Sequence, residues 1–400
     1  MQKIKLKNGL TVIYKENEGN SVAVEVLIKV GSNNETIDEK GISHFIEHMA
    51  FEGTKKRKDG REIANEIEKI GGELNAYTSN EKTCFYIKVL SKHFDKALDV
   101  LSDILQNPLM REKDINKEKK VVTKEIDLVN DEPRFYQWVL FEGNLFEKHP
   151  TKFPTYGSKK VIEGLNRKKV SDYYNKYYVP NNMVISIVGK IKDWKKKVEG
   201  KFVFGKGNEV KELKVKEPIS KKNKIKKEKR KITNSYLVLG FKTVIRTHPD
   251  SYVLDVINGI LGRGQSGWMF NEIRGKRGLA YEVGTQHAAE KDYGYFAIYS
   301  STDKNKIELV KKLILGQLNK LKNISPNDLK ESKEYIEGSY LLEMEDNQKL
   351  ADGLLFWEQI GDANLVNEFV KKIKQVTIND VKKVVDKYFK NYCLAIVEGK

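Results

Sequence analysis

Cysteine is nearly absent from this sequence: the 400 residues include only Cys84 and Cys393, and there is no Cys-x-x-Cys pair. The two lie in strand-like runs in different halves of the chain, so their spacing suggests neither a disulfide scaffold nor a cysteine-bound metal. No segment approaches the roughly 20 consecutive apolar residues of a membrane-spanning helix. Met1 is followed by lysines and a strand-like run rather than an apolar leader. We expect a cytoplasmic protein, or a mature form whose leader has been removed.

Proline is also rare, with 8 in the chain, and one of them interrupts a lysine-dense stretch over 211–231. Such a low-complexity stretch is typical of a linker. A chain of 400 residues exceeds a usual single domain, and its 39% of hydrophobic residues can supply two cores. We therefore expect a first domain over 1–210, a linker over 211–231 and a second domain over 232–400.

Two internal echoes indicate that these domains are related. A tyrosine-rich helical segment followed by an apolar strand-like run occurs once in each half, and so does a second apolar run. The echoed segments are 172–190 with 385–400, and 22–28 with 235–241. The pattern predicts an α+β fold with two related domains, each an antiparallel β-sheet covered by helices.

The most informative motif is His44-Phe45-Ile46-Glu47-His48, inside a run otherwise apolar enough for a buried helix. Residues four apart lie on one helix face about 6 Å apart, so both histidines can approach one ion while Glu47 borders the same face. HxxEH reverses the HExxH zinc-protease motif, in which imidazoles bind Zn²⁺ and the carboxylate acts as a base on water. The alternative is two partly exposed histidines on an amphipathic helix.

A catalytic zinc site needs a third protein ligand. From 115 to 129, apolar residues recur at helical spacing, and Glu118 and Glu125 interrupt the same stripe. Burying an unpaired carboxylate is costly, so this position indicates a compensating metal, the alternative being a lysine partner. The two glutamates lie two turns apart, about 10.5 Å, so we expect only one to reach the metal. Periodicity does not say which.

Three features together resemble the M16 family of inverzincin metallopeptidases, whose members include the mitochondrial processing peptidase, pitrilysin and insulin-degrading enzyme. They are HFIEHMAFEGT over 44–54, GGELNAYTS over 71–79, and the pair Glu118 and Glu125. In that family the second glutamate of the pair is the ligand. The resemblance implies that His44, His48 and Glu125 bind zinc, with Glu47 as the general base and Glu118 as a supporting carboxylate near the site.

The likeness continues along the chain. Residues 149–157 and 177–183 are similar to the end of the family's first domain, and 261–281 resembles the segment that carries its substrate-clamping Arg and Tyr. The resemblance implies that these are Arg274 and Tyr281; the alternative is an ordinary surface arginine and a half-buried tyrosine.

The run from Asn75 to Ser79 alternates like a strand whose backbone could pair with an extended peptide. The alternative is a plain sheet strand after a turn at Gly71 and Gly72, and both can hold at once. The resemblance implies that Asn75 and Ala76 contact substrate backbone. In the second half, the counterpart of the zinc helix, 252–259, has no ligands, so we expect one Zn²⁺ per chain.

The family resemblance therefore implies a zinc-dependent endopeptidase acting on peptides or unfolded polypeptide segments. Relatives of double length carry the clamp in the opposite half of the molecule. We therefore expect a homodimer in which the zinc of one subunit faces Arg274 and Tyr281 of the other.

Three other interpretations remain open. The net charge of +17 is compatible with a nucleic-acid-binding protein, although aromatic residues do not alternate with the lysines of 211–231 and no binding motif is present. The other two are an inactive scaffold subunit of the same family and one half of an obligate heteromer. We expect no nucleic-acid or membrane partner.

Overall fold

The computed structural model describes residues 1–205, 207–210 and 215–400, which form two compact units. Unit 1 comprises Met1–Asp127, Phe153–Leu213 and Glu343–Asn364, and unit 2 comprises Leu128–Lys152, Lys214–Leu342 and Leu365–Lys400. Each unit is therefore assembled from separate stretches of the sequence.

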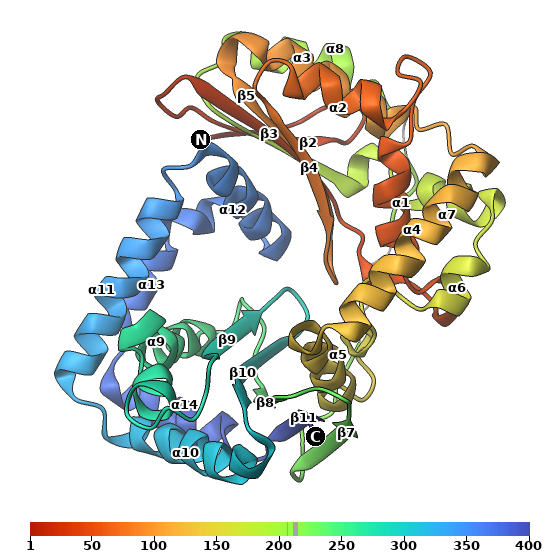
Figure 1. The fold of residues 1–400 in the computed structure, drawn as a ribbon. Helices are drawn as coiled ribbons and strands as arrows, with labels where there is room; N and C mark the ends of the chain where they lie inside the picture. Colours follow the sequence, from red (N-terminus) through yellow and green to blue (C-terminus); the bar gives the residue numbers. More distant parts are fainter. Residues whose placement is uncertain (206, 211–214) are drawn as a thin grey trace. The chain divides into compact units, whose positions relative to one another are not determined.

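Unit 1 is built on a six-stranded sheet (Figure 1). Its strands are β1 (Gln2–Lys5), β2 (Thr11–Lys15), β3 (Ser21–Ile28), β4 (Glu73–Thr78), β5 (Thr83–Leu90) and β6 (Met183–Val188). They lie in the order β1-β2-β6-β3-β5-β4, and all neighbours are antiparallel except β2 and β6, which are parallel. Strand β4 is therefore an edge strand.

Helices cover both faces of this sheet. The helices of unit 1 are α1 (Ile42–Phe51), α2 (Gly60–Glu68), α3 (Phe94–Gln106), α4 (Glu112–Asp131), α6 (Lys159–Glu163), α7 (Arg167–Tyr177), α8 (Trp194–Lys201) and α12 (Asn347–Ile360); the last residues of α4 belong to unit 2. Figure 1 shows α2, α3 and α8 on one side of the sheet, and α12 contacts β3 and β6 from the other. Seven of the eight β3 residues are buried, as expected for a strand enclosed on both faces.

Unit 2 repeats this plan with five strands. They are β7 (Lys224–Lys229), β8 (Ser235–Lys242), β9 (Val283–Ala289), β10 (Gly294–Thr302) and β11 (Cys393–Glu398), in the order β7-β11-β8-β10-β9. The pair β7 and β11 is parallel and the other pairs are antiparallel.

The helices of unit 2 complete the repeat. They are α5 (Pro133–Leu145), α9 (Asp250–Gly262), α10 (Ile307–Lys320), α11 (Pro326–Glu343), α13 (Phe369–Gln375), α14 (Ile378–Tyr388) and a π-helix, η7 (Phe270–Gly275). Helix α5 contacts β8 and β11, just as α12 contacts β3 and β6 in unit 1.

The predicted fold class and internal repeat are confirmed. Strands β3 and β8 occupy equivalent places in the two sheets, as do β6 and β11, and each of the latter follows a tyrosine-containing helix, α7 or α14. The expectation of purely antiparallel sheets is wrong at one strand pair in each unit, because β2 and β7 run parallel to their inner neighbours.

The linear division of the chain differs from the observed units. The segment 128–152, with α5, belongs to unit 2, and 343–364, with α12, belongs to unit 1. The linker interpretation is also wrong over Lys224–Lys229, which form β7; residues 211–214 lie outside the described residues. The lysines of β7 suit an edge strand, where charged side chains remain in water and discourage pairing with other chains.

Within the described ranges, no helix combines the length and apolar character needed to cross a membrane. The cytoplasmic location expected from the sequence stays a prediction.

A buried carboxylate fixes the start of α1. Glu35 accepts hydrogen bonds from the backbone N–H groups of Gly41 and Ser43, each at 2.8 Å, and so caps a helix terminus whose donors have no partner inside the helix. Gly41 has a φ of 100°, and a β-carbon there would lie 2.5 Å from the carbonyl oxygen of Tyr156. Burial raises the pKa of Glu35 to about 7, against the opposing effect of these hydrogen bonds.

Replacing Glu35 with alanine should destabilise unit 1. Two buried N–H groups would lose their acceptor, so we expect the free energy of unfolding of the metal-free protein to fall by about 2 kcal/mol or more, measured by urea unfolding with far-UV circular dichroism. The exposed Glu16→Ala substitution is the matched control and should change this value by less than about 0.5 kcal/mol. Equal unfolding curves for the two variants would contradict the capping role.

The pH dependence of this difference has a definite sign. Because the folded-state pKa of Glu35 is raised from 4.5 to about 7, its contribution to stability is fully present below 4.5 and is lost as the pH rises through 7. The difference between wild type and Glu35→Ala should therefore be larger near pH 5 than near pH 8, by roughly 1–3 kcal/mol.

Candidate metal centre

Helix α1 presents the motif histidines on one face, as the sequence predicts. The Nε2 atoms of His44 and His48 lie 3.3 Å apart. The apolar residues of the helix face the core of unit 1, where Ile42, Phe45, Ile46 and Met49 are fully buried. The motif is therefore part of a packed helix, and its polar side is free to form a site.

Helix α4 brings a carboxylate to the two histidines. Oε2 of Glu125 lies 3.9 Å from Nε2 of His44 and 3.5 Å from Nε2 of His48. A tetrahedral zinc ion with ligand bonds of about 2.0–2.1 Å separates its ligand atoms by about 3.4 Å. The three atoms therefore fit a zinc ion with small adjustments, and two imidazoles with a carboxylate are a ligand set that zinc accepts.

The other glutamate of α4 lies behind the site. Oε2 of Glu118 is 3.2 Å from Nδ1 of His48, and Glu118 is buried. A carboxylate that accepts the Nδ1–H bond directs the Nε2 lone pair of the imidazole toward the metal position. The geometry thus fits Glu125 as the third ligand and Glu118 as the carboxylate that orients His48.

The electrostatics of the histidines differ. Burial, and then the neighbouring His48, lower the pKa of His44 to about 4, so His44 is a neutral imidazole near pH 7. Burial also acts to lower the pKa of His48, but the hydrogen bond to Glu118 and the charge of Glu125 outweigh it and the pKa is raised. Burial acts to raise the pKa of Glu118, and the same bond to His48 lowers it overall.

Glu47 is held beside these residues by the sheet. The hydroxyl of Thr78, the last residue of β4, donates a hydrogen bond of 2.5 Å to Oε2 of Glu47. Burial raises the pKa of Glu47, although this bond and the charge of His48 oppose the rise. Sequence reasoning included Thr78 in a run that could pair with a peptide but did not link it to Glu47. The available signal was its position in an alternating strand close to the zinc helix.

The substrate-binding residues inferred from the resemblance lie on the edge strand. Asn75 is exposed on β4, where its Oδ1 accepts the backbone N–H of Ala76 at 2.8 Å. Strand β5 occupies one side of β4, and the sheet ends on the other.

Arg274 and Tyr281 come together in unit 2. Arg274 lies in η7, and its Cζ is 5.3 Å from the centroid of the Tyr281 ring, within cation–π range. Tyr281 is 71% exposed, so it is not the half-buried tyrosine of the alternative interpretation. The two residues line a cavity of about 420 Å³. The predicted site residues are therefore divided between the two units: the candidate metal ligands, the two other glutamates and the β4 residues lie in unit 1, and this pair lies in unit 2.

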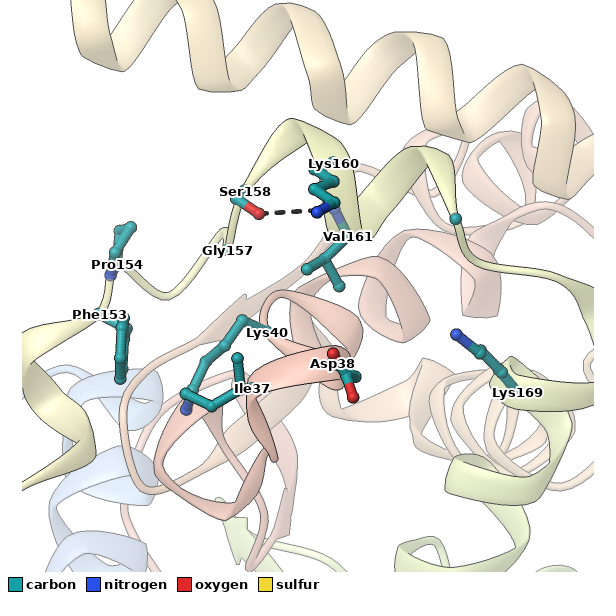
Figure 2. A pocket seen from close by; sticks show the side chains of 11 residues that line it. Ile37, Asp38, Lys40, Phe153, Pro154, Gly157, Ser158, Lys160, Val161 and Lys169 are labelled. Atoms are coloured by element: carbon teal, nitrogen blue, oxygen red, sulfur yellow. Dashed lines mark hydrogen bonds between the residues drawn. The ribbon is translucent and has the colours of Figure 1, made fainter.

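A separate cavity of about 470 Å³ lies in unit 1 (Figure 2). Its lining residues come from the segment Ile37 to Lys40, from the segment Phe153 to Gly164 and from Lys169, and none of the predicted site residues is among them. One lining residue, Lys40, directly precedes Gly41, the N-cap of α1, so the cavity adjoins the N-terminal end of this helix.

Comparisons with known proteins show the family of this chain. The family described as Insulinase (Peptidase family M16) matches residues 11–152, and Peptidase M16 inactive domain matches residues 164–336. An uncharacterized zinc protease of Bacillus subtilis, YmxG, is 33% identical over 396 residues, which cover 98% of this chain and 96% of that protein. A probable mitochondrial-processing peptidase subunit beta of Arabidopsis thaliana is 29% identical, over 98% of this chain and 76% of its own.

A solved structure shows the same fold. The crystal structure of a protease from Helicobacter pylori matches with a TM-score of 0.94 at 25% identity, and the match covers 99% of each chain. The chain therefore belongs to peptidase family M16, and relatives in that family carry the name zinc protease.

Substituting the two glutamates of α4 separately tests their roles. Glu125→Gln should lose most of its zinc, because one of three protein ligands becomes a weakly coordinating amide. Glu118→Gln should keep zinc, with an affinity lower by roughly 10- to 100-fold, since it changes only the partner of His48. Metal content after dialysis at defined free zinc measures both. The reverse result, zinc lost from Glu118→Gln and kept by Glu125→Gln, would exchange the two assignments.

Proposed function

We propose that this protein is a zinc-dependent endopeptidase that hydrolyses peptides or unfolded polypeptide segments. The observation that carries the proposal is the convergence of His44, His48 and Glu125. The carboxylate of Glu47 lies beside them and is not one of the three candidate ligands. Relatives named zinc proteases support the reaction class.

Each residue then has a chemical task. The two imidazoles and Glu125 would hold the zinc ion, which would supply the Lewis-acid chemistry that polarises a peptide carbonyl and makes a water molecule more acidic. Glu47 accepts the proton of the attacking water and passes it to the leaving amine. Because Oε2 of Glu47 accepts a hydrogen bond from the Thr78 hydroxyl, we propose that Oε1 accepts the proton of the water molecule. Thr78 thereby positions the base.

The edge strand β4 is the proposed docking place for substrate. An extended peptide can add to a sheet edge through main-chain hydrogen bonds, which are indifferent to side-chain identity. Asn75 and Ala76 lie on this strand, and Thr78 links its end to Glu47. A peptide paired with β4 would therefore run toward the base.

Arg274 and Tyr281 are proposed as a clamp on the substrate, supported by their proximity and by the exposure of the Tyr281 ring. They belong to the part of the chain that matches the Peptidase M16 inactive domain. We further propose a homodimer with an enclosed chamber, in which the clamp of one subunit serves the zinc centre of the other.

An inactive scaffold is the second candidate, because that matched domain carries the word inactive in its description. In this chain the description suits unit 2, because α9, the helix equivalent to α1, contains no histidine. Unit 1 keeps the complete ligand set and Glu47, so an enzyme is the better proposal.

The Glu47→Gln substitution tests the reaction. Glutamine keeps the shape of the side chain but cannot accept the proton, so peptide cleavage should fall by roughly 10² or more while zinc content stays near that of wild type. Cleavage of a peptide mixture followed by mass spectrometry, together with metal analysis, measures both. Glu68→Gln, an exposed change at the end of α2, is the control and should be fully active. Retained cleavage in Glu47→Gln would remove it from the mechanism.

Subunit mixing tests the shared site. One inactive variant is Glu47→Gln, and the other combines Arg274→Ala with Tyr281→Phe. After exchange, half of the dimers are mixed and one of their two sites is intact, so activity should recover to about one quarter of wild type. No recovery, with exchange verified by mass spectrometry of tagged subunits, would mean that the clamp acts on the zinc centre of its own chain.

A further inference from the structure

A second cluster of ionisable residues lies in unit 1, on the sheet face covered by α12. Glu25 of β3, Cys84 of β5, Tyr77 of β4 and Asp352 of α12 contribute to it. The Tyr77 hydroxyl donates to Asp352, and the ammonium group of Lys82 lies 3.5 Å from Oδ1 of Asp352. None of these residues belongs to the zinc centre of α1 and α4.

Glu25 is the unexplained member of the cluster. Its side chain is fully buried beside Cys84 and Asp352, and neither carboxylate oxygen has a hydrogen bond of normal geometry to a described residue. It lies opposite Tyr86 on β5 and Ser186 on β6, and the buried Ser186 hydroxyl likewise has no partner within the described ranges. Because an unpaired buried carboxylate is strongly unfavourable, this position calls for a cation or a proton.

Three ligand atoms converge at this point. One carboxylate oxygen of Glu25, the Sγ of Cys84 and one carboxylate oxygen of Asp352 all lie within 4.8 Å of one another. A thiolate and two carboxylates are ligands that zinc accepts, at about 2.3 Å for sulfur and 2.0–2.2 Å for oxygen, so modest side-chain movement would bring all three to one ion. A water molecule on the side of the partly exposed Asp352 would be the fourth ligand. The Tyr77 hydroxyl already orients Asp352, as partners of metal ligands usually do.

The charges also balance. Two carboxylates and a thiolate carry three negative charges, and a divalent ion together with the ammonium group of Lys82 carries three positive charges. With Lys82 alone, two carboxylates share one cation and Glu25 must hold a proton. Burial, and then the charge of Asp352, raise the pKa of Glu25, so that protonated form is the competing state.

We propose that Glu25, Cys84 and Asp352 form a second, structural zinc site that fastens α12 to the sheet of unit 1. This proposal is independent of the peptidase proposal and raises the expected metal content from one zinc per chain to two. The sequence gives no sign of this site, because its ligands are 59 (84 − 25) and 268 (352 − 84) residues apart and form no Cys-x-x-Cys pair.

Cobalt substitution distinguishes the two sites, since only the second contains sulfur. The full chain is stripped of metal and reloaded with Co²⁺, and bound metal per chain is measured together with the charge-transfer absorption of a cobalt–thiolate bond. Wild type should bind two equivalents and show this absorption. His48→Ala should bind one equivalent of Co²⁺ and keep the thiolate absorption. Cys84→Ser should bind one equivalent of Co²⁺ and lack this absorption.

Matched variants make the result decisive. Cys393→Ser, a change at the other buried cysteine, should behave as wild type. If Cys84→Ser does not fold, Asp352→Asn, at a partly exposed position, should also lose the second equivalent. In the His48→Ala background, removing zinc should lower the thermal unfolding midpoint, and adding Asp352→Asn should abolish this effect. A single equivalent in wild type with no thiolate absorption would overturn the site and leave the cluster neutralised by Lys82 and a proton on Glu25.

Discussion

The arrangement of this chain depends on one constraint: both faces of each central sheet must be covered. Strand β3 is buried along seven of its eight residues, so its two side-chain rows both need partners. One row packs against the core that includes α1 and α3, and this packing orients α1 so that the histidines point away from the sheet. The other row is closed by α12, a helix from the far end of the sequence. The same solution appears in unit 2, where α5 comes from the first half.

The metal centre was largely predictable because it depends on short-range geometry. His44, Glu47 and His48 are linked by one helical turn, so periodicity placed them on one side of a packed helix. Periodicity also placed Glu118 and Glu125 on the apolar stripe of a second helix, where carboxylates are unusual. Periodicity did not choose between the two glutamates. The family resemblance implied Glu125, and the observed distances fit that choice. The internal repeat was readable for a similar reason, since each echo joins neighbouring elements.

Contacts between distant segments were not predictable. The bond from Thr78 to Glu47 and the cluster around Glu25 depend on tertiary packing, which leaves no period in the sequence. The Glu35 cap on α1 is local, but Glu35 lies six residues before Gly41, outside the N-cap position that sequence patterns mark. The exchange of α5 and α12 contradicted a linear division of domains, because composition marks a change of segment but not the sheet on which a helix packs. Strand β7 was mistaken for a linker because its lysines satisfy an edge strand as well as a solvated loop.

The position of α12 has a consequence for synthesis on the ribosome. All six strands of the unit 1 sheet end by Val188, whereas the helix that closes its outer face ends at Ile360, 172 residues later (360 − 188). At translation rates of about 5–20 residues per second, the nascent sheet waits roughly 10–30 s with that face uncovered. During this interval a buried carboxylate such as Glu25 is still in contact with water, and the exposed apolar row is a natural binding surface for chaperones. The first half of the chain therefore emerges as an incomplete folding unit, and its sheet can be closed only after α12 has been made.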